Sequence, residues 1–295
     1  MTTPLPSLRD LVDAGAHFGH RRSRSHPKAH PYVYAIRDRV LVVNLEKTLE
    51  KLEAARKAIE QFASAQKSLL FVGTKPQAKV AIKLAAEFLD QPYITHRWLG
   101  GMLTNFDTIR LNLGKLTRLE EVAASPEFAE FTKKERGLIG KRIERLNKIF
   151  GGLKKLDKLP DVLVVIDINE EDIAVREARA KGIPVIALVD TNANPELVTY
   201  PIPGNDDSRK TIEIILGQLT EAYRRGQSRS LKQEENTIVE LTEESLELLP
   251  QSSAEIKTRA KKAVKAQAKK SVAKKTVVRK TVSKKLAKSS TPIEK

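Results

Sequence analysis

The chain has 295 residues, 53 Lys and Arg against 37 Asp and Glu, a formal net charge of +16 and no cysteine. The lack of cysteine excludes a disulfide scaffold, cysteine zinc sites, thiol catalysis and iron–sulfur clusters, and it is typical of a reducing compartment. Because the sequence shows neither a signal peptide nor an apolar run of membrane-spanning length, we expect a protein that is not exported and has no membrane partner.

The first unusual element is residues 15–34, where cations and imidazoles are concentrated among glycine and prolines that predict a loop. Arginine forks and imidazoles on an irregular backbone suit the phosphates of a folded RNA. We therefore predict an RNA-binding site that contains His17, His20, Arg21, Arg22, Arg24 and Lys28.

Two alternatives stay open for the same segment. It could be a solvated basic loop without a ligand, or the spacing of His17, His20, His26 and His30 could form a four-histidine metal site. The surrounding arginines disfavour a cation, and no carboxylate or thiolate completes the set. We therefore expect no metal.

Three apolar runs follow along the chain, at 69–73, 162–166 and 184–189, and 40–44 is a fourth candidate. Strands without polar alternation are buried on both faces, as in a parallel sheet covered by helices. Helical stripes alternate with these runs, which predicts right-handed crossovers and a three-layer α/β/α domain. The stripes are Leu45, Leu49, Leu52, Ile59 and Phe62, and then Ile212, Ile215, Leu216, Leu219 and Tyr223.

Polar residues follow the predicted strands at what would be the carboxyl edge of the sheet. Residues 73–75 (Gly-Thr-Lys) lie where phosphates bind in open α/β sheets, and Asp167 and Asp190 end two other strands. A nucleotide-binding module or an enzyme using this edge is therefore an alternative hypothesis. Most of these acids, with Asp206 and Asp207 before the last helix, are better explained as helix caps, and no nucleophile has an adjacent base. We expect no catalytic residue, cofactor or small-molecule substrate.

Residues 97–105 contain Arg97 and the only tryptophan, Trp98, next to paired glycines. The indole could stack on an RNA base, but a lone tryptophan on an α/β domain is usually packed in the core or at an interface. We therefore predict that Trp98 packs near the base of the next element and that Arg97 binds RNA.

That next element, residues 106–153, interrupts the alternation of strands and helices. Its apolar residues step by three and four, which is the spacing of a coiled-coil seam and predicts an antiparallel helical hairpin inserted into the sheet domain. Gly151 and Gly152 would end the second arm. That arm carries the basic residues Lys133, Lys134, Arg136, Lys141, Arg142 and Arg145, of which the first three are predicted to bind RNA.

The end of the chain divides by charge. Residues 1–233 carry a net charge of +9, 234–255 carry −7 and 256–295 carry +14. We expect a globular unit over 1–227, an acidic linker over 228–255 and a disordered, lysine-rich tail over 256–295. The tail repeats basic doublets every five residues. On a helix these doublets would spread around all faces, so the pattern suits a flexible polycation better than a membrane helix. A DNA-binding protein that acts through this tail is a further alternative.

Six motifs in chain order give the sequence a resemblance to the bacterial-type ribosomal protein S2 family. They are GAHFGH (15–20), NLEKT (44–48), WLGGMLTNF (98–106), PDVLVVID (160–167), IPVIALVDTN (183–192) and YPIPGNDD (200–207). The similarity extends from about residue 7 to residue 225 and includes a coiled-coil insertion at the expected place.

The resemblance implies a flavodoxin-like domain with a protruding helical hairpin, bound to 16S ribosomal RNA between the head and body of the small subunit. It also implies contacts with other small-subunit proteins, including help in docking ribosomal protein S1, and no enzymatic activity. The protein would act in cytoplasmic ribosomes of bacteria or in organellar ones. This chain departs from the family at Ser25 and His26, where Trp-Asn is common, and at Pro76, which replaces a lysine and suits the first turn of a helix.

Overall fold

The computed structural model describes residues 4–247, with side chains up to Ser230 apart from that of Ala129. Its main sheet has five parallel strands in the order β5-β4-β6-β7-β8, and with β4 counted as the first strand this is the flavodoxin-like order 2-1-3-4-5. Every residue of β4, β6 and β7 is buried, which explains their unbroken apolar sequences. The strands are β4 Leu69–Val72, β5 Tyr93–Ile94, β6 Val162–Ile166, β7 Val185–Val189 and β8 Tyr200–Pro203.

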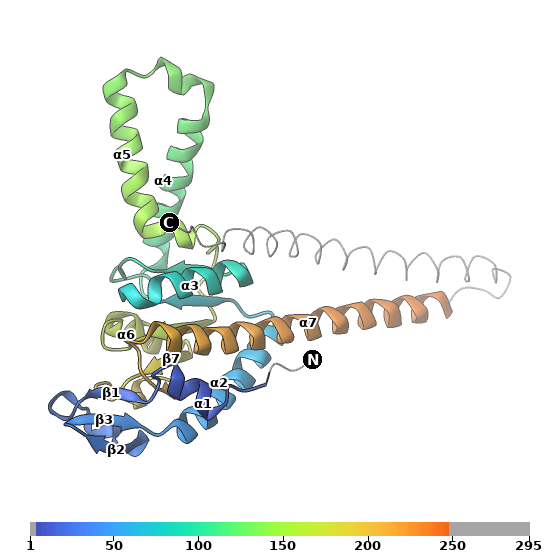
Figure 1. The fold of residues 1–295 in the computed structure, drawn as a ribbon. Coiled ribbons are helices and arrows are strands. Elements are labelled where there is room, and N and C mark those ends of the chain that lie inside the picture. The colour runs from blue at the N-terminus through green and yellow to red at the C-terminus, as the bar shows by residue number, and fades with distance from the viewer. Residues whose placement is uncertain (1–3, 248–295) are drawn as a thin grey trace, which may run out of the picture.

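Helices cover both faces of this sheet, so the predicted three-layer α/β/α arrangement is confirmed (Figure 1). On one face α2 Leu45–Ser64, α3 Pro76–Leu89 and α7 Arg209–Glu247 pack around the buried ring of Phe71. On the other face α6 Asp172–Ala180 packs together with the base of the helical hairpin. Pro76 is the first residue of α3, as predicted.

A second, antiparallel sheet of three strands precedes the main sheet, in the order β1-β3-β2. We call residues 18–43 the lobe. The segment predicted as a loop is therefore mostly ordered into short elements. These are β1 Phe18–Arg21, the 3-10 helices η1 Arg22–Arg24 and η2 Pro27–Tyr32, β2 Val33–Arg37 and β3 Val40–Val43; a short helix, α1 Leu8–Asp13, comes before them.

The strand predicted at 40–44 exists, but its proposed place in the parallel sheet is wrong. It is β3, the central strand of the lobe. Leu41 and Val43 are buried whereas Val40 and Val42 are only half-buried, so one face alone packs against the core. A run of four apolar residues does not distinguish a strand buried on both faces from one buried on a single face.

The predicted helical hairpin is present and projects from the sheet domain (Figure 1). Its base is buried at Ile109, Leu116 and Phe150. Gly152 lies so close to β5 that an added Cβ atom would be 2.2 Å from the Tyr93 carbonyl oxygen. The hairpin consists of α4 Phe106–Ala124, η3 Pro126–Glu130, α5 Lys133–Phe150 and η4 Gly151–Leu153.

The last described element, α7, runs from Arg209 to Glu247 and packs along α2. The predicted acidic linker, 228–255, is therefore helical up to Glu247. The lysine-rich tail predicted for 256–295 lies outside the described residues. Within the described part of the chain, no helix is long and apolar enough to cross a membrane.

Candidate nucleic-acid interface

The far end of the lobe brings together arginines from two stretches of the sequence, 21–24 and 37–39. A tight turn joins β2 to β3, and in it Arg39 has a positive φ of 63°. Arg21 and Arg37 flank Val40 on the neighbouring strands, and the Arg22 N–H donates to the Arg39 carbonyl oxygen at 2.8 Å. We call this cluster the arginine end: Arg21, Arg22, Arg24, Arg37 and Arg39.

All five side chains of the arginine end are exposed. Within residues 4–230 none of them forms an ion pair, although many other surface cations do so, such as Lys57 with Glu53. Planar guanidinium groups held close together without carboxylate partners form a strong binding site for phosphate oxygens. The arginine end is therefore the best candidate in the described part of the chain for a contact with a nucleic-acid backbone.

Sequence reasoning found Arg21, Arg22 and Arg24 but missed Arg37 and Arg39. The signal was present, because Arg-Asp-Arg at 37–39 separates two short apolar runs and so marks a hairpin turn. What the sequence did not show is that β3 pairs with both β1 and β2, which places this turn beside Arg21 and Arg22.

His20 connects the lobe to the main sheet. Its Nδ1 lies 2.9 Å from Asp190 Oδ2, the Asn192 amide nitrogen lies 3.4 Å from its Nε2, and its backbone N–H donates to Thr191 Oγ1 at 2.8 Å. The hydrogen bond to Asp190 raises the pKa of His20 above its ordinary value, against the opposing effect of burial. We predicted His20 as an RNA contact, but its ring is 81% buried and hydrogen-bonded within the protein, so we assign it to the support of the lobe.

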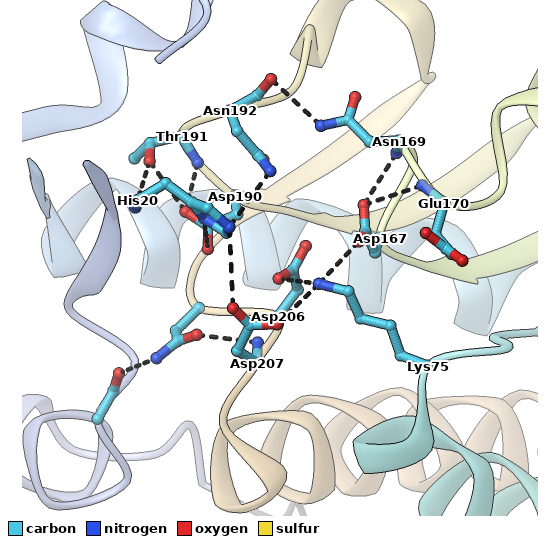
Figure 2. A network of polar contacts seen from close by, with 12 residues as sticks. His20, Lys75, Asp167, Asn169, Glu170, Asp190, Thr191, Asn192, Asp206 and Asp207 are labelled. Atoms are coloured by element: carbon cyan, nitrogen blue, oxygen red, sulfur yellow. Dashed lines mark hydrogen bonds and ion pairs between the residues drawn. The ribbon is translucent and has the colours of Figure 1, made fainter. Parts of the chain in front are cut away.

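Figure 2 shows the ionic network next to His20, at the carboxyl edge of the main sheet. The ammonium group of Lys75 lies 2.7 Å from Asp167, 2.7 Å from Asp206 and 2.9 Å from Asp207. Burial works against its charge, but these hydrogen bonds raise the pKa of Lys75. Asp206 is fully buried, and burial together with the charges of Asp167 and Asp190 raises its pKa to about 7. We call Lys75, Asp167, Asp190, Asp206, Asp207 and His20 the edge network.

The edge network argues against the nucleotide-binding alternative. Lys75, the cation that would attract a phosphate, is bound to three carboxylates, and the Thr74 N–H donates to Glu171 at 2.7 Å. A phosphate entering here would meet several carboxylates and would have to displace their partners. The crevice that often binds ligands in this fold is closed by the protein's own charges.

The predicted capping roles at this edge are partly correct. Asp167 accepts hydrogen bonds from the N–H groups of Asn169 and Glu170, which shape the turn before α6. Asp206 and Asp207 do not cap α7, because Ser208 stands directly before that helix with its hydroxyl 3.5 Å from the Thr211 N–H. Both aspartates bind Lys75 instead.

Two other histidines of the basic segment, His17 and His26, make local contacts. The His17 ring packs on Phe18 with 4.0 Å between ring centroids, and His26 accepts a hydrogen bond from the Lys28 N–H at the start of η2. Lys28, predicted to bind RNA, pairs with Glu196. Among the described residues no group of three or more histidine and acidic side chains is arranged to hold a metal ion, so the four-histidine alternative has no support there.

A second basic surface lies on α5, the second helix of the hairpin. Lys133, Lys134 and Arg136 occupy the first turn of α5, which Thr132 and Glu135 cap. Cations are unfavourable at a helix N-terminus, so helix stability does not explain them. Four further exposed cations, Lys141, Arg142, Arg145 and Lys148, follow along α5, and none of these seven forms an ion pair within residues 4–230. We call Lys133, Lys134, Arg136, Lys141, Arg142 and Arg145 the basic arm.

The segment at the base of the hairpin confirms the prediction that Trp98 is a packing residue. Its ring is 94% buried, and its Nε1 donates to Glu177 at 3.1 Å. Arg97, the residue before it, is exposed. Arg97 therefore keeps its predicted availability for RNA, whereas Trp98 is not available for stacking on a base.

The two basic surfaces lie on opposite sides of the sheet domain. In Figure 1 the lobe and the hairpin are at opposite ends of the molecule, with the main sheet and its helices between them. A rigid body that presents unpaired cations at two distant places is suited to hold two separate stretches of a polyanion in a fixed relative position.

Comparison with known proteins gives one consistent family. The family model described as "Ribosomal protein S2" matches residues 11–226. A relative from Helicobacter hepaticus named "Small ribosomal subunit protein uS2" is 41% identical over 258 residues, covering 86% of this chain and 97% of that protein. Proteins of the same name from Dictyoglomus thermophilum (43% over 219 residues, 74% and 89% covered) and Thermus thermophilus (47% over 212 residues, 72% and 83% covered) are similar.

Proposed function

The chain belongs to the ribosomal protein S2 family and is therefore a structural protein of the small ribosomal subunit, and we propose that it binds 16S ribosomal RNA through the arginine end and the basic arm. The observation that carries the proposal is the arginine end, where five exposed guanidinium groups lie together without an ion pair in the described part of the chain. Burying such a cluster against an apolar protein surface would leave charges unpaired, whereas phosphates neutralise it.

The proposed mechanism is placement. Contacts to phosphates fix position and orientation without reading bases, and the edge network and the packed base of the hairpin keep the two surfaces at a constant separation. Family members are ribosomal proteins and not enzymes, and the closed edge of the main sheet agrees with a role that needs no substrate pocket.

The test removes charge from the arginine end. The triple variant Arg21→Ala, Arg22→Ala, Arg37→Ala keeps Arg39, so the tight turn between β2 and β3 is left unchanged. Binding to small subunits that lack this protein is measured by sucrose-gradient sedimentation over a range of salt concentrations. We expect at least a tenfold loss of affinity at low salt and a decrease of about 2 in the slope of log affinity against log salt.

The matched control also removes three cations, but from exposed helix ion pairs. In Lys57→Ala, Arg176→Ala, Arg209→Ala, each lost cation is paired with an acid four residues away. This control should bind almost as the unchanged protein does. Equal affinities for the two triple variants, or absence of the unchanged protein from the small-subunit peak, would contradict the proposal.

We also propose, from the family resemblance, that the protein lies between the head and body of the subunit and helps to dock ribosomal protein S1. Two basic surfaces at opposite ends of one rigid body suit a bridge between two parts of the subunit. Subunits reconstituted with and without this protein should differ in their S1 content by quantitative mass spectrometry. Equal S1 content would remove this part of the proposal and leave RNA binding untouched.

The tail at 256–295 gives a weaker, separate prediction. If its fifteen cations only add attraction to phosphates, a chain that ends at residue 255 still joins the subunit, with a smaller salt slope. Loss of all nucleic-acid binding in that shortened chain would instead favour the DNA-binding alternative.

A further inference from the structure

A single carboxylate holds the segment that leads into the hairpin. Glu177, on α6, is 92% buried and accepts five hydrogen bonds, all from the segment just before α4. Its Oε1 accepts from Trp98 Nε1 at 3.1 Å and from the Gly101 N–H at 2.7 Å. Its Oε2 accepts from the Leu103 N–H at 2.9 Å and from the N–H and hydroxyl of Thr104, each at 3.0 Å.

None of these five donors carries a charge, so the network is not a salt bridge. The segment before α4 is irregular, with a positive φ of 91° at Gly101. The N–H groups of this segment therefore cannot form the regular hydrogen bonds of a strand or helix. Met102 and Leu103 are buried there, where an unpaired N–H group is costly. Burial opposes the charge of Glu177, but the hydrogen bonds from Thr104, Leu103 and the other donors lower its pKa, so it stays ionised.

Glu177 lies where a small change in geometry would alter the orientation of the whole hairpin. Leu103 and Thr104 precede Asn105, the N-cap of α4, so the negative charge of Glu177 lies close to the start of that helix, where it is favourable. α6 packs on the main sheet, whereas the hairpin projects away from it. α5 alone has 18 residues, or about 27 Å, so a tilt of about 10° at the base would move the far end by roughly 5 Å.

We infer that Glu177 is a positioning residue, which fixes the direction of the hairpin and thereby sets the basic arm relative to the arginine end. The inference rests on the proposed function only for its consequence in RNA binding. The mechanical part concerns the protein alone and can be tested without RNA.

The first experiment uses the absence of native cysteine, which allows spin labels to be attached at chosen positions. One pair of labels, at Ser23→Cys and Leu138→Cys, both exposed, reports the distance between lobe and hairpin. A second pair, at Ser23→Cys and Gln77→Cys, reports the distance between lobe and α3. Glu177→Gln keeps the shape of the side chain but replaces one accepting oxygen with an NH2 group. In Glu177→Gln, double electron–electron resonance (DEER) should show a distribution of lobe–hairpin distances that is broader than in the unchanged protein or shifted by several ångströms. The distribution of lobe–α3 distances should stay unchanged.

Two results would overturn the inference: an unchanged lobe–hairpin distribution, or equal broadening of both distributions, which would make Glu177 a residue of general stability. If Glu177→Gln does not fold, Trp98→Phe removes only one of the five hydrogen bonds and should give a smaller broadening of the same kind.

The second experiment follows the consequence for RNA by hydroxyl-radical footprinting of reconstituted subunits. Glu177→Gln should lose the protections that depend on Lys133, Lys134 and Arg136 and keep those that depend on the arginine end. If the unchanged protein shows no protection that depends on these three residues, the proposed function of the hairpin fails while the spin-label result still decides the role of Glu177. Retention of all protections in Glu177→Gln would contradict its role in RNA binding.

Discussion

The lobe and the hairpin present similar charges but are held by different forces. The lobe meets the main sheet through His20, which belongs to the edge network, and in that network one half-buried ammonium group neutralises several carboxylates. The hairpin is held by buried apolar residues at its base and by one carboxylate with neutral donors. The attachment of the lobe therefore includes a charge network, whereas that of the hairpin depends more on shape and burial.

This difference predicts different responses to change. A buried network of opposite charges tolerates the loss of a partner poorly, because the remaining charges stay buried. An apolar interface loses stability in proportion to the atoms removed and the cavity left behind. Variants of the two regions should therefore differ in size of effect and in dependence on pH.

The largest effect is expected at Lys75. Lys75→Met leaves Asp167, Asp206 and Asp207 without their shared cation, and we expect a loss of about 3 kcal/mol or more in the free energy of unfolding at pH 8. At pH 6 the loss should be smaller, because Asp206, with its pKa near 7, can take up a proton. Urea denaturation followed by circular dichroism measures both.

The matched control for this variant is Lys79→Met, one helical turn further along α3. Lys79 is half-buried and forms no ion pair within residues 4–230, so its replacement should change the free energy of unfolding by less than about 0.5 kcal/mol. Equal losses in the two variants would show that the edge network does not stabilise this part of the molecule.

For the hairpin, the expected loss follows burial within one helix. Leu116 is fully buried at the base, whereas Leu111, also on α4, is 67% exposed. Leu116→Ala should lower the free energy of unfolding by about 3 kcal/mol, and Leu111→Ala should leave it almost unchanged, because only the first substitution leaves a cavity. This effect should be the same at pH 6 and pH 8, unlike that of Lys75→Met.

The same contrast explains how much the sequence could predict. The hairpin could be predicted because its apolar residues repeat at short intervals along the chain. The central strands could be predicted because both their faces are buried, which makes their sequences apolar throughout. The sheet of the lobe could not be predicted, because its strands are only four or five residues long and the pairing of β1 with β3 joins residues about twenty positions apart. Spacing likewise could not show that Lys75 neutralises Asp206, since the two residues are 131 positions apart.

A smaller loss should come from the tight contact between the hairpin and β5. At Gly152 an added Cβ would lie 2.2 Å from the backbone oxygen of Tyr93, so Gly152→Ala must push the two segments apart, at a cost of about 2 kcal/mol. Its neighbour Gly151 is the matched control, because there the nearest atom, Asn147 Oδ1, is 3.5 Å away. Thermal unfolding should show a lower Tm for Gly152→Ala only, and equal values would mean that this contact does not fix the hairpin.

The edge network should also make the stability of the protein depend on pH. The pKa of Asp206 rises from 3.8 to about 7 on folding, and that of His20 rises above 6.5. In both cases the folded protein holds more protons than the unfolded chain between the two values, so the free energy of unfolding should fall as pH increases from 5 to 8. Asp206→Asn removes the larger of these contributions.

The slope of stability against pH should therefore be shallower in Asp206→Asn, with a difference of about 2.5 kcal/mol between pH 5 and pH 8. Asp207→Asn is the control, because Asp207 binds the same ammonium group but its side chain is 53% exposed, so solvent already screens its charge. Equal slopes in Asp206→Asn and in the unchanged protein would show that the buried carboxylate is not protonated in this range.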